Sequence, residues 1–388
     1  MSEIDGESSP DLQQFIDREH LLLASYATHS SDTQGRVHLE SEHLYRAPYA
    51  RDRDRILHSS AFRRLSGKMQ VFTGEMGIYH RTRLTHTFEV ASVARTLARA
   101  LRLNEDLTEA LALMHDIGHP PYGHCGEDAL DACLAAAGGF SHNQFALVVV
   151  QELEKRYLNF DGLNLSHETL AGQDVRANKE AAAVGRSPSL EVQIVDLADS
   201  IAYDAHDVDD ALQLGLLTIA ELKDLSIIQR AILTTGEPID VLPKQQIRVE
   251  LVRALIDLQV SDLLHQSSDR LMPHGGKSCD EVCSLGVRLE HSTLIASERE
   301  ELEQFLFETV YRHKRLIPVR EAAADRLQVL FDTLSQDPLR LPLRFRNRAE
   351  QSSPAVATGQ YLAGMTDQFC DQQYRQLTGP SSGPLADW

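Results

Sequence analysis

The chain has 388 residues, of which 42% are hydrophobic and 24% charged, a composition typical of a soluble globular protein with a large buried core. Its formal net charge of -19 argues against broad electrostatic binding to nucleic acid, so such binding is not indicated, although a local cluster of basic residues can still hold a small anion. The sequence contains no apolar run of about 18 residues and no secretory signal pattern, and its five cysteines are an odd number. These features predict no membrane span and a cytoplasmic location with reduced thiols.

The predicted elements are almost all helices. Residues 1–40 form a partly flexible lead-in with one short amphipathic helix, and residues 376–388 form a flexible tail. Apolar residues at spacings of three and four predict helices over these ranges: 51–65, 83–103, 126–137, 142–157, 189–213, 218–234, 245–268, 296–316, 319–335 and 354–375.

Two local signals refine this all-α prediction. Asn104 is a candidate N-cap for a helix that runs to His115, and Gly118 with the following Pro-Pro pair ends that helix. Strand signals are sparse, and residues 73–82 are the candidate for a small β-hairpin. We therefore expect a helical core over 41–230 that carries the functional site, with a helical C-terminal region over 231–375 packed on it.

Four residues of metal-binding type interrupt these helices: His86, the adjacent pair His115 and Asp116, and Asp199. A short turn after residue 103 makes the first two helices antiparallel and brings His86 toward His115. Neighbours on a helix diverge by about 100°, so Asp116 shares one ion with His115 only near the helix end at Gly118. Asp199 lies in a largely apolar helix, where a carboxylate is costly to bury unless a cation compensates it.

Two imidazoles and two carboxylates suit one divalent ion per subunit, either Mg, Mn or another first-row transition metal. With open positions for water and substrate, such a site predicts a metal-dependent hydrolase. The alternative is that the four residues form unrelated salt bridges and helix caps.

The segment HPPYGHCGED supplies groups for proton transfer: His119, His124 and Glu127. Histidine exchanges protons near neutral pH, and a carboxylate one helical turn away can orient it. The alternative for His124 is a capping role for the helix that begins near Gly126.

The order His, His-Asp, Asp is the signature of HD-domain metal phosphohydrolases. The surrounding segments resemble the deoxyguanosinetriphosphate triphosphohydrolase family in its shorter bacterial branch. They include YRAPYARDRDRILHSSAFRRLSGKMQVF, YHRTRLTHTFEVASVARTLARALRLNEDLTEALALMHDIGHPPYGHCGEDAL, GGFSHNQFALVVV, LADSIAYDAHDVDDAL and YLAGMTDQF, and the resemblance covers about residues 20–375.

This resemblance implies a large helical HD-domain fold and cleavage of a deoxynucleoside triphosphate (dNTP) at the α-phosphorus, which releases deoxynucleoside and triphosphate. It also implies a homo-oligomer, and a dNTP activator in many members. Among the residues, it implies that His124 and Glu127 are the catalytic pair and that His119 is a phosphate contact or second acid. His142 would complete this rim.

The resemblance also implies substrate contacts. Arg83 would bind phosphate, Tyr203 would pack against the deoxyribose and exclude a 2′ hydroxyl, and Asp207 would bind the 3′ hydroxyl. Lys68 and Gln70 are weaker candidates for substrate contact.

One stretch departs from the family pattern. Where the family has a Lys-His element and a Pro-rich turn, this chain has QDVRANKEAAAVGRSPS within residues 171–189, so base preference and regulation are not predicted. Two other functions stay open: a different HD-domain phosphohydrolase, such as a nucleotidase or phosphodiesterase, and a non-catalytic deoxynucleotide sensor.

Overall fold

The computed structural model describes residues 12–70, 81–178, 185–234 and 243–379, and within these ranges it contains helices and turns but no β-strand. The all-α prediction is therefore confirmed. The predicted hairpin at 73–82 lies mostly outside the described residues, as do the first residues of the lead-in and most of the tail.

The α-helices of these ranges are α1 (Leu12–Leu22), α2 (Pro48–Leu57), α3 (Ser60–Arg64), α4 (Arg83–Ala100), α5 (Glu105–Met114), α6 (Gly123–Leu134), α7 (His142–Val148), α8 (His167–Ala177), α10 (Leu190–Gln213), α11 (Ile219–Leu222), α12 (Ser226–Thr234), α13 (Lys244–Leu271), α14 (Cys279–Ser284), α15 (Thr293–Leu306), α16 (Ile317–Gln336), α17 (Leu343–Gln351), α18 (Pro354–Ala363) and α19 (Asp367–Thr378). Two π-helical turns, η4 (Val149–Leu153) and η7 (Phe307–Tyr311), continue α7 and α15.

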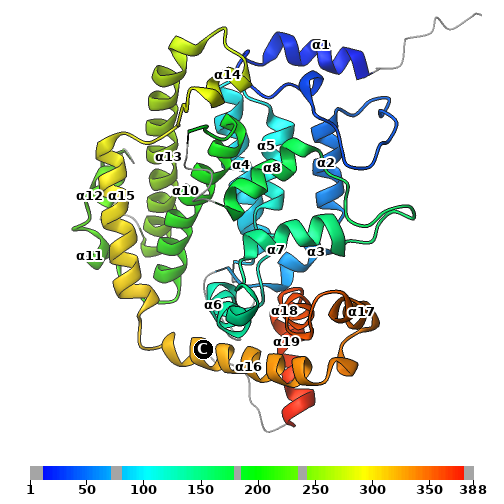
Figure 1. The fold of residues 1–388 in the computed structure, drawn as a ribbon. Helices are drawn as coiled ribbons and strands as arrows, with labels where there is room; N and C mark the ends of the chain where they lie inside the picture. The colour runs from blue at the N-terminus through cyan, green and yellow to red at the C-terminus, as the bar shows by residue number, and fades with distance from the viewer. Residues whose placement is uncertain (1–11, 71–80, 179–184, 235–242, 380–388) are drawn as a thin grey trace, which may run out of the picture.

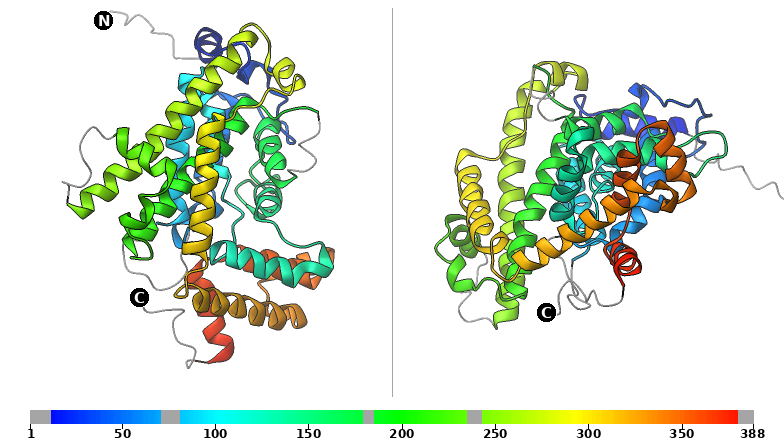
Figure 2. Two further views of the ribbon diagram at one scale, coloured as in Figure 1. Left: turned by 90° about the vertical axis from the view of Figure 1, so that its left-hand side faces the viewer. Right: turned by 60° about the horizontal axis from the view of Figure 1, so that its bottom comes forward.

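Helices α4, α5 and α10 form the centre of the molecule (Figure 1). Helix α4 packs against both α5 and α10, α2 covers the other side of α5, and α13 packs on α10. Helices α16 to α19 gather at one end, where α16 and α18 contact α6, and two further views show the same grouping (Figure 2). This arrangement places the end of α5 and the start of α6 between the central helices and the C-terminal group.

Polar caps set where the central helices begin. Thr82 caps α4 by accepting a hydrogen bond from the backbone N–H of Thr85. The side chain of Asn104 accepts from the backbone N–H of Leu107, which confirms the predicted cap of α5. Helix α6 begins at Gly123, earlier than predicted, after Tyr122 adopts a left-handed conformation with φ of 65°.

Several predicted helices are shorter in the structure because caps interrupt them. The range 51–65 divides at Ser59, whose side chain caps α3. The range 354–375 divides between α18 and α19, where Thr366 caps the second helix. Three helices were not predicted, α8, α14 and α17, and the first two start at the serine caps Ser166 and Ser278. Apolar periodicity alone does not reveal such breaks.

The apolar core does not stop at the end of the central helices. One buried cluster runs from Ala27 to Cys370 and joins α4, α5 and α10 to α6, α16 and α18. A second cluster, from Ala205 to Leu316, lies between α10, α12, α13 and α15. The division into a core at 41–230 and a C-terminal region at 231–375 stays a prediction.

Within the described ranges, no single helix is long and apolar enough to cross a membrane. One bent pair, Gly123–Ala137 with His142–Leu153, passes that length and composition test only when both parts are combined across a 73° bend.

Candidate active site

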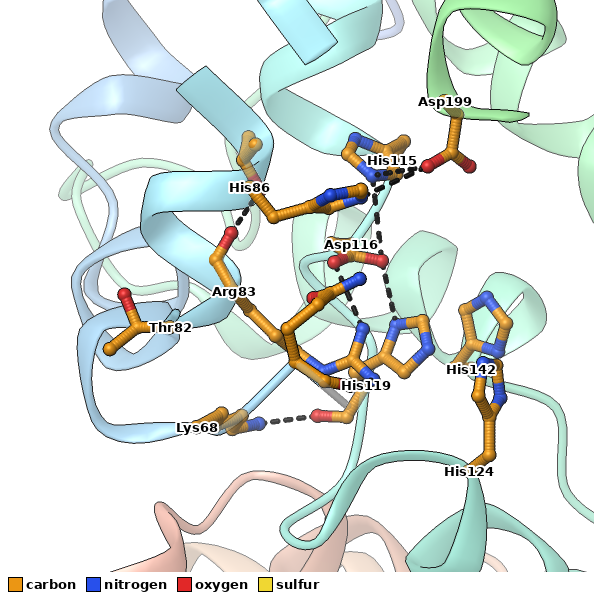
Figure 3. A network of polar contacts seen from close by, with 12 residues as sticks. Lys68, Thr82, Arg83, His86, His115, Asp116, His119, His124, His142 and Asp199 are labelled. Atoms are coloured by element: carbon orange, nitrogen blue, oxygen red, sulfur yellow. Dashed lines mark hydrogen bonds and ion pairs between the residues drawn. The ribbon is translucent and has the colours of Figure 1, made fainter. Parts of the chain in front are cut away.

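The three central helices bring His86, His115 and Asp199 to one point (Figure 3). His86 Nε2 lies 3.0 Å from Asp199 Oδ1, and His115 Nε2 lies 3.6 Å from the same oxygen. One ligand atom from each of the three residues lies within 4.8 Å of the other two. We call these three residues the metal cluster, because their nitrogen and oxygen atoms converge as an ion requires.

The chemistry of His115 fits a metal ligand. Its Nδ1 lies 2.6 Å from the carbonyl oxygen of Ala112, which can only accept, so Nδ1 carries the proton. Its Nε2 is therefore a lone pair, and this buried atom has no hydrogen-bond partner among the described residues. Burial also lowers the pKa of His115, which keeps the ring neutral. An orphaned lone pair beside a carboxylate is the arrangement that a cation satisfies.

Asp199 is held as a charged carboxylate. Burial raises the pKa of Asp199, but His115, His86 and Arg176 outweigh it and bring the pKa well below its usual range. Arg176, from α8, binds Asp199 Oδ2 at 2.8 Å and Asp196 Oδ1 at 2.6 Å. Because Arg176 occupies Oδ2, the other oxygen of Asp199 faces the two histidines.

Asp116 lies beside the metal cluster with its oxygens shared among several groups. Its Oδ2 accepts from Arg83 Nη1 at 2.9 Å, and its Oδ1 lies 3.0 Å from His119 Nδ1 and 3.5 Å from His115 Nε2. Burial raises the pKa of Asp116, but His119, Arg83 and His115 lower it well below the usual range. Asp116 is therefore a charged carboxylate 3.5 Å from the lone pair of His115 Nε2.

The start of α6 and the start of α7 form a histidine-rich rim. Glu127 accepts from the ring of His142 at 2.8 Å and from its backbone N–H at 2.9 Å, while His124 Nδ1 lies 3.6 Å from Glu127. The rings of His119 and His142 stack with centroids 3.7 Å apart. Burial raises the pKa of Glu127, but the nearby ring of His124 and the hydrogen bonds from His142 lower it far more, so Glu127 is charged. The carboxylate thus serves two histidines rather than one.

A cavity of about 630 Å³ opens beside the metal cluster. The sequence-predicted residues that line it are Gln70, His124, Asp199, Tyr203 and Asp207. Among the lining residues that sequence reasoning missed are Arg176, Tyr311 and Arg320.

Two predicted substrate contacts are engaged with protein atoms. Lys68 is 2% exposed and donates to the carbonyl oxygens of His119 and Ala363. Arg83 is 1% exposed and its guanidinium binds Asp116. Their roles as substrate contacts stay predictions.

The deoxyribose candidates form a small network with Tyr311. The hydroxyl of Tyr311 donates to Asp207 Oδ2 and contacts the hydroxyl of Tyr203. Asp207 Oδ1 is buried and has no hydrogen-bond partner among the described residues. Burial raises the pKa of Asp207 well above its usual range. Tyr311 belongs to the π-helical turn η7, which the apolar pattern of 296–316 did not indicate.

Two family models match parts of this chain. The HD domain family model matches residues 83–204, which span α4 to the middle of α10, and the phosphohydrolase-associated domain model matches residues 289–376. Fold and site thus define an HD-domain phosphohydrolase.

Curated relatives narrow that class. Proteins named deoxyguanosinetriphosphate triphosphohydrolase-like protein are 42% identical over 369 residues in Bordetella pertussis, 41% over 365 residues in Thiobacillus denitrificans and 40% over 366 residues in Nitrosomonas europaea. Each match covers 92% of this chain, and 96%, 97% and 97% of the respective relative. The chain belongs to the deoxyguanosinetriphosphate triphosphohydrolase-like family.

Proposed function

We propose that the protein hydrolyses dNTPs at the α-phosphorus and releases deoxynucleoside and triphosphate, with one divalent ion, Mg, Mn or another first-row metal, per subunit. The observation that carries the proposal is that Asp199 of the metal cluster lines the same cavity as Tyr203 and Asp207. A cation-binding group and a polar network of hydroxyl and carboxyl groups in one cavity match a nucleotide substrate better than an isolated metal site would.

His86, His115, Asp116 and Asp199 would hold the ion. When bound, a divalent ion supplies Lewis acidity toward a phosphoryl oxygen and makes water more acidic. Arg176 keeps one oxygen of Asp199 turned toward the histidines, and Arg83 does the same for Asp116 from the other side.

The candidates for proton transfer are the histidines of the rim, His119, His124 and His142. The 5′ oxygen of the deoxynucleoside needs a proton as its bond to phosphorus breaks. His124 is the rim histidine that lines the cavity, and its side chain is 51% exposed. Glu127 orients it, while buried His119, whose pKa burial lowers well below the usual range, is a neutral neighbour suited to a phosphate contact.

Tyr203 and Asp207 would read the sugar. Asp207 Oδ1 is buried and unpaired, so it is available to a 3′ hydroxyl. The ring of Tyr203 beside it would leave no room for a 2′ hydroxyl, so ribonucleotides would be excluded sterically.

An activity matrix of each dNTP with Mg and Mn, including dNTP mixtures, tests the proposal when the products are separated by ion exchange. We expect triphosphate and deoxynucleoside. Orthophosphate or pyrophosphate as the product would instead indicate a different HD-domain phosphohydrolase, and binding without turnover would indicate a sensor. The variant Asp199→Ala is the control for contaminating phosphatases.

We further propose that the enzyme acts in the cytoplasm as a homo-oligomer that a second dNTP activates. Its five cysteines are free thiols, as a reducing compartment would keep them. Size-exclusion chromatography with and without dNTPs, run beside the mixtures of the matrix, tests assembly and activation together.

A further inference from the structure

A buried histidine that has no role in the proposed mechanism contacts His86 of the metal cluster. His206, on α10, has a side chain that is only 4% exposed. Its Nδ1 lies 3.2 Å from Nδ1 of His86, and its Nε2 lies 3.0 Å from Glu89 Oε2. Glu89 is three residues after His86 on α4 and is itself bound by Arg81. The contacts form a chain from Glu89 through His206 to His86.

Only one placement of the ring protons in the contacts from Glu89 through His206 to His86 suits metal binding. His86 can bind an ion through Nε2 only if that nitrogen is a lone pair, so its single proton must sit on Nδ1. That proton needs an acceptor, and the atom facing it is Nδ1 of His206. Nδ1 of a neutral His206 can accept because the ionised carboxylate of Glu89 takes the N–H on the opposite side of the ring.

We propose that His206 and Glu89 are positioning residues of the metal centre. Glu89 fixes the tautomer of His206, and His206 in turn holds His86 with its Nε2 toward Asp199. This inference rests on the metal-binding part of the proposed function, but not on the identity of the substrate.

His115 is oriented in the same way, by an acceptor that binds its Nδ1, but the acceptor is a different group. There the fixed acceptor is the backbone carbonyl of Ala112, which no side-chain substitution removes. His86 depends on a side chain instead, so its orientation can be tested by mutation. Partners that orient metal ligands typically contribute about 10-fold to 100-fold in metal affinity.

Two substitutions at His206 distinguish its effect on the orientation of His86 from its contribution to packing. The side-chain oxygen of His206→Asn reaches the place of Nδ1 and keeps an acceptor for His86, whereas His206→Leu removes it. Mn²⁺ affinity is measured by calorimetry on nucleotide-free protein. We expect His206→Leu to weaken Mn²⁺ binding about 100-fold, His206→Asn less than about 10-fold, and Glu89→Gln about 10-fold, because the side chain of Glu89 is 46% exposed.

His291 provides a matched control. It is also a histidine with a buried side chain, 3% exposed, that binds a carboxylate, Asp262, at 3.0 Å, but it belongs to neither the metal cluster nor the cavity lining. His291→Leu should leave Mn²⁺ affinity unchanged, and circular dichroism should show that each variant is folded.

The inference is overturned if His206→Leu binds Mn²⁺ like the wild type. It is also overturned if the Asn and Leu variants lose affinity equally, or if His291→Leu loses as much, since packing alone would explain those results. Because no nucleotide is present, the outcome is independent of dNTP turnover. A wild type that binds Mn²⁺ but cleaves no dNTP would refute the substrate proposal and leave this one standing.

Discussion

Two histidines are candidates for the proposed proton donor, and they differ in their contacts and in their exposure. Glu127 makes two ring contacts of 2.8 Å with His142 but lies 3.6 Å from His124. By hydrogen bonding alone His142 would be the partner of Glu127. However, His124 lines the cavity with a side chain that is 51% exposed, against 15% for His142. Access to substrate therefore favours His124 as the donor, with His142 as a brace for Glu127.

Replacing His124 with alanine should lower kcat by about 10²-fold to 10⁴-fold, the usual contribution of a positioned acid or base, which corresponds to roughly 3–5 kcal/mol of barrier. The change removes no atom of the metal cluster, so metal content should stay that of the wild type. Replacing His142 should lower kcat by only about 10-fold, because Glu127 keeps its charge but loses a hydrogen bond worth on the order of 1–2 kcal/mol.

The assay is steady-state turnover of the best dNTP at saturating metal, with the metal content of each variant measured by mass spectrometry. Unchanged turnover in His124→Ala would remove that residue from the mechanism. A larger loss in His142→Ala than in His124→Ala, at equal metal content, would reverse the assignment of the two histidines.

Three further predictions concern a proposed metal ligand and two buried residues near the site. Asp199→Ala should lose bound metal and turnover together, and Mn²⁺ added after chelation should restore the wild type but not the variant; a variant that retains metal would contradict the ligand assignment. A Cβ on Gly118 would lie 2.0 Å from the backbone oxygen of His142, so Gly118→Ala should destabilise the fold by at least about 1–3 kcal/mol in urea unfolding, whereas Gly275→Ala, whose Cβ would lie 3.6 Å from its nearest neighbour, should not. Burial lowers the pKa of Lys68 from 10.5 to about 7, so between these values the unfolded chain binds more protons than the folded one. The stability of the wild type relative to Lys68→Met should therefore rise as the pH increases from about 7 to 10.5, by up to about 5 kcal/mol at 1.36 kcal/mol per unit, and a difference that does not change with pH would show that Lys68 titrates normally.

The all-α fold could be predicted because its signals are local. Helices such as 83–103 and 189–213 carry long apolar stripes, and the Asn104 cap can be read from residue type and position alone. The convergence of His86 with His115 followed from the short turn between their helices. Breaks inside a predicted helix were missed where a single serine, such as Ser59, competes for the backbone N–H groups.

The residues that support the site could not be predicted in this way. His206, Arg176 and Tyr311 act through contacts across 120, 23 and 104 positions of the chain. Sequence spacing carries no information about such pairs unless both elements and their packing angle are known. Arg176 also lies in the stretch that departs from the family pattern, so the resemblance offered no guide to it.

The acidic residues of helix α10 differ in how their neighbours stabilise them, and Asp199 stands out as the one suited to the proposed ion. Carboxylates are costly to bury, and two of those on α10 are paired with arginines. Asp204 binds Arg299 at 2.8 Å, and Asp196 binds Arg176 at 2.6 Å, whereas burial raises the pKa of Asp207 well above its usual range. Asp199 is different, because Arg176 reaches only Oδ2. The remaining oxygen faces two imidazole nitrogens, of which that of His115 has no other partner among the described residues. The lone pair of His115 Nε2 and the carboxylate oxygen of Asp199 are both hydrogen-bond acceptors, so they do not bond to each other, but both can donate an electron pair to a positive ion.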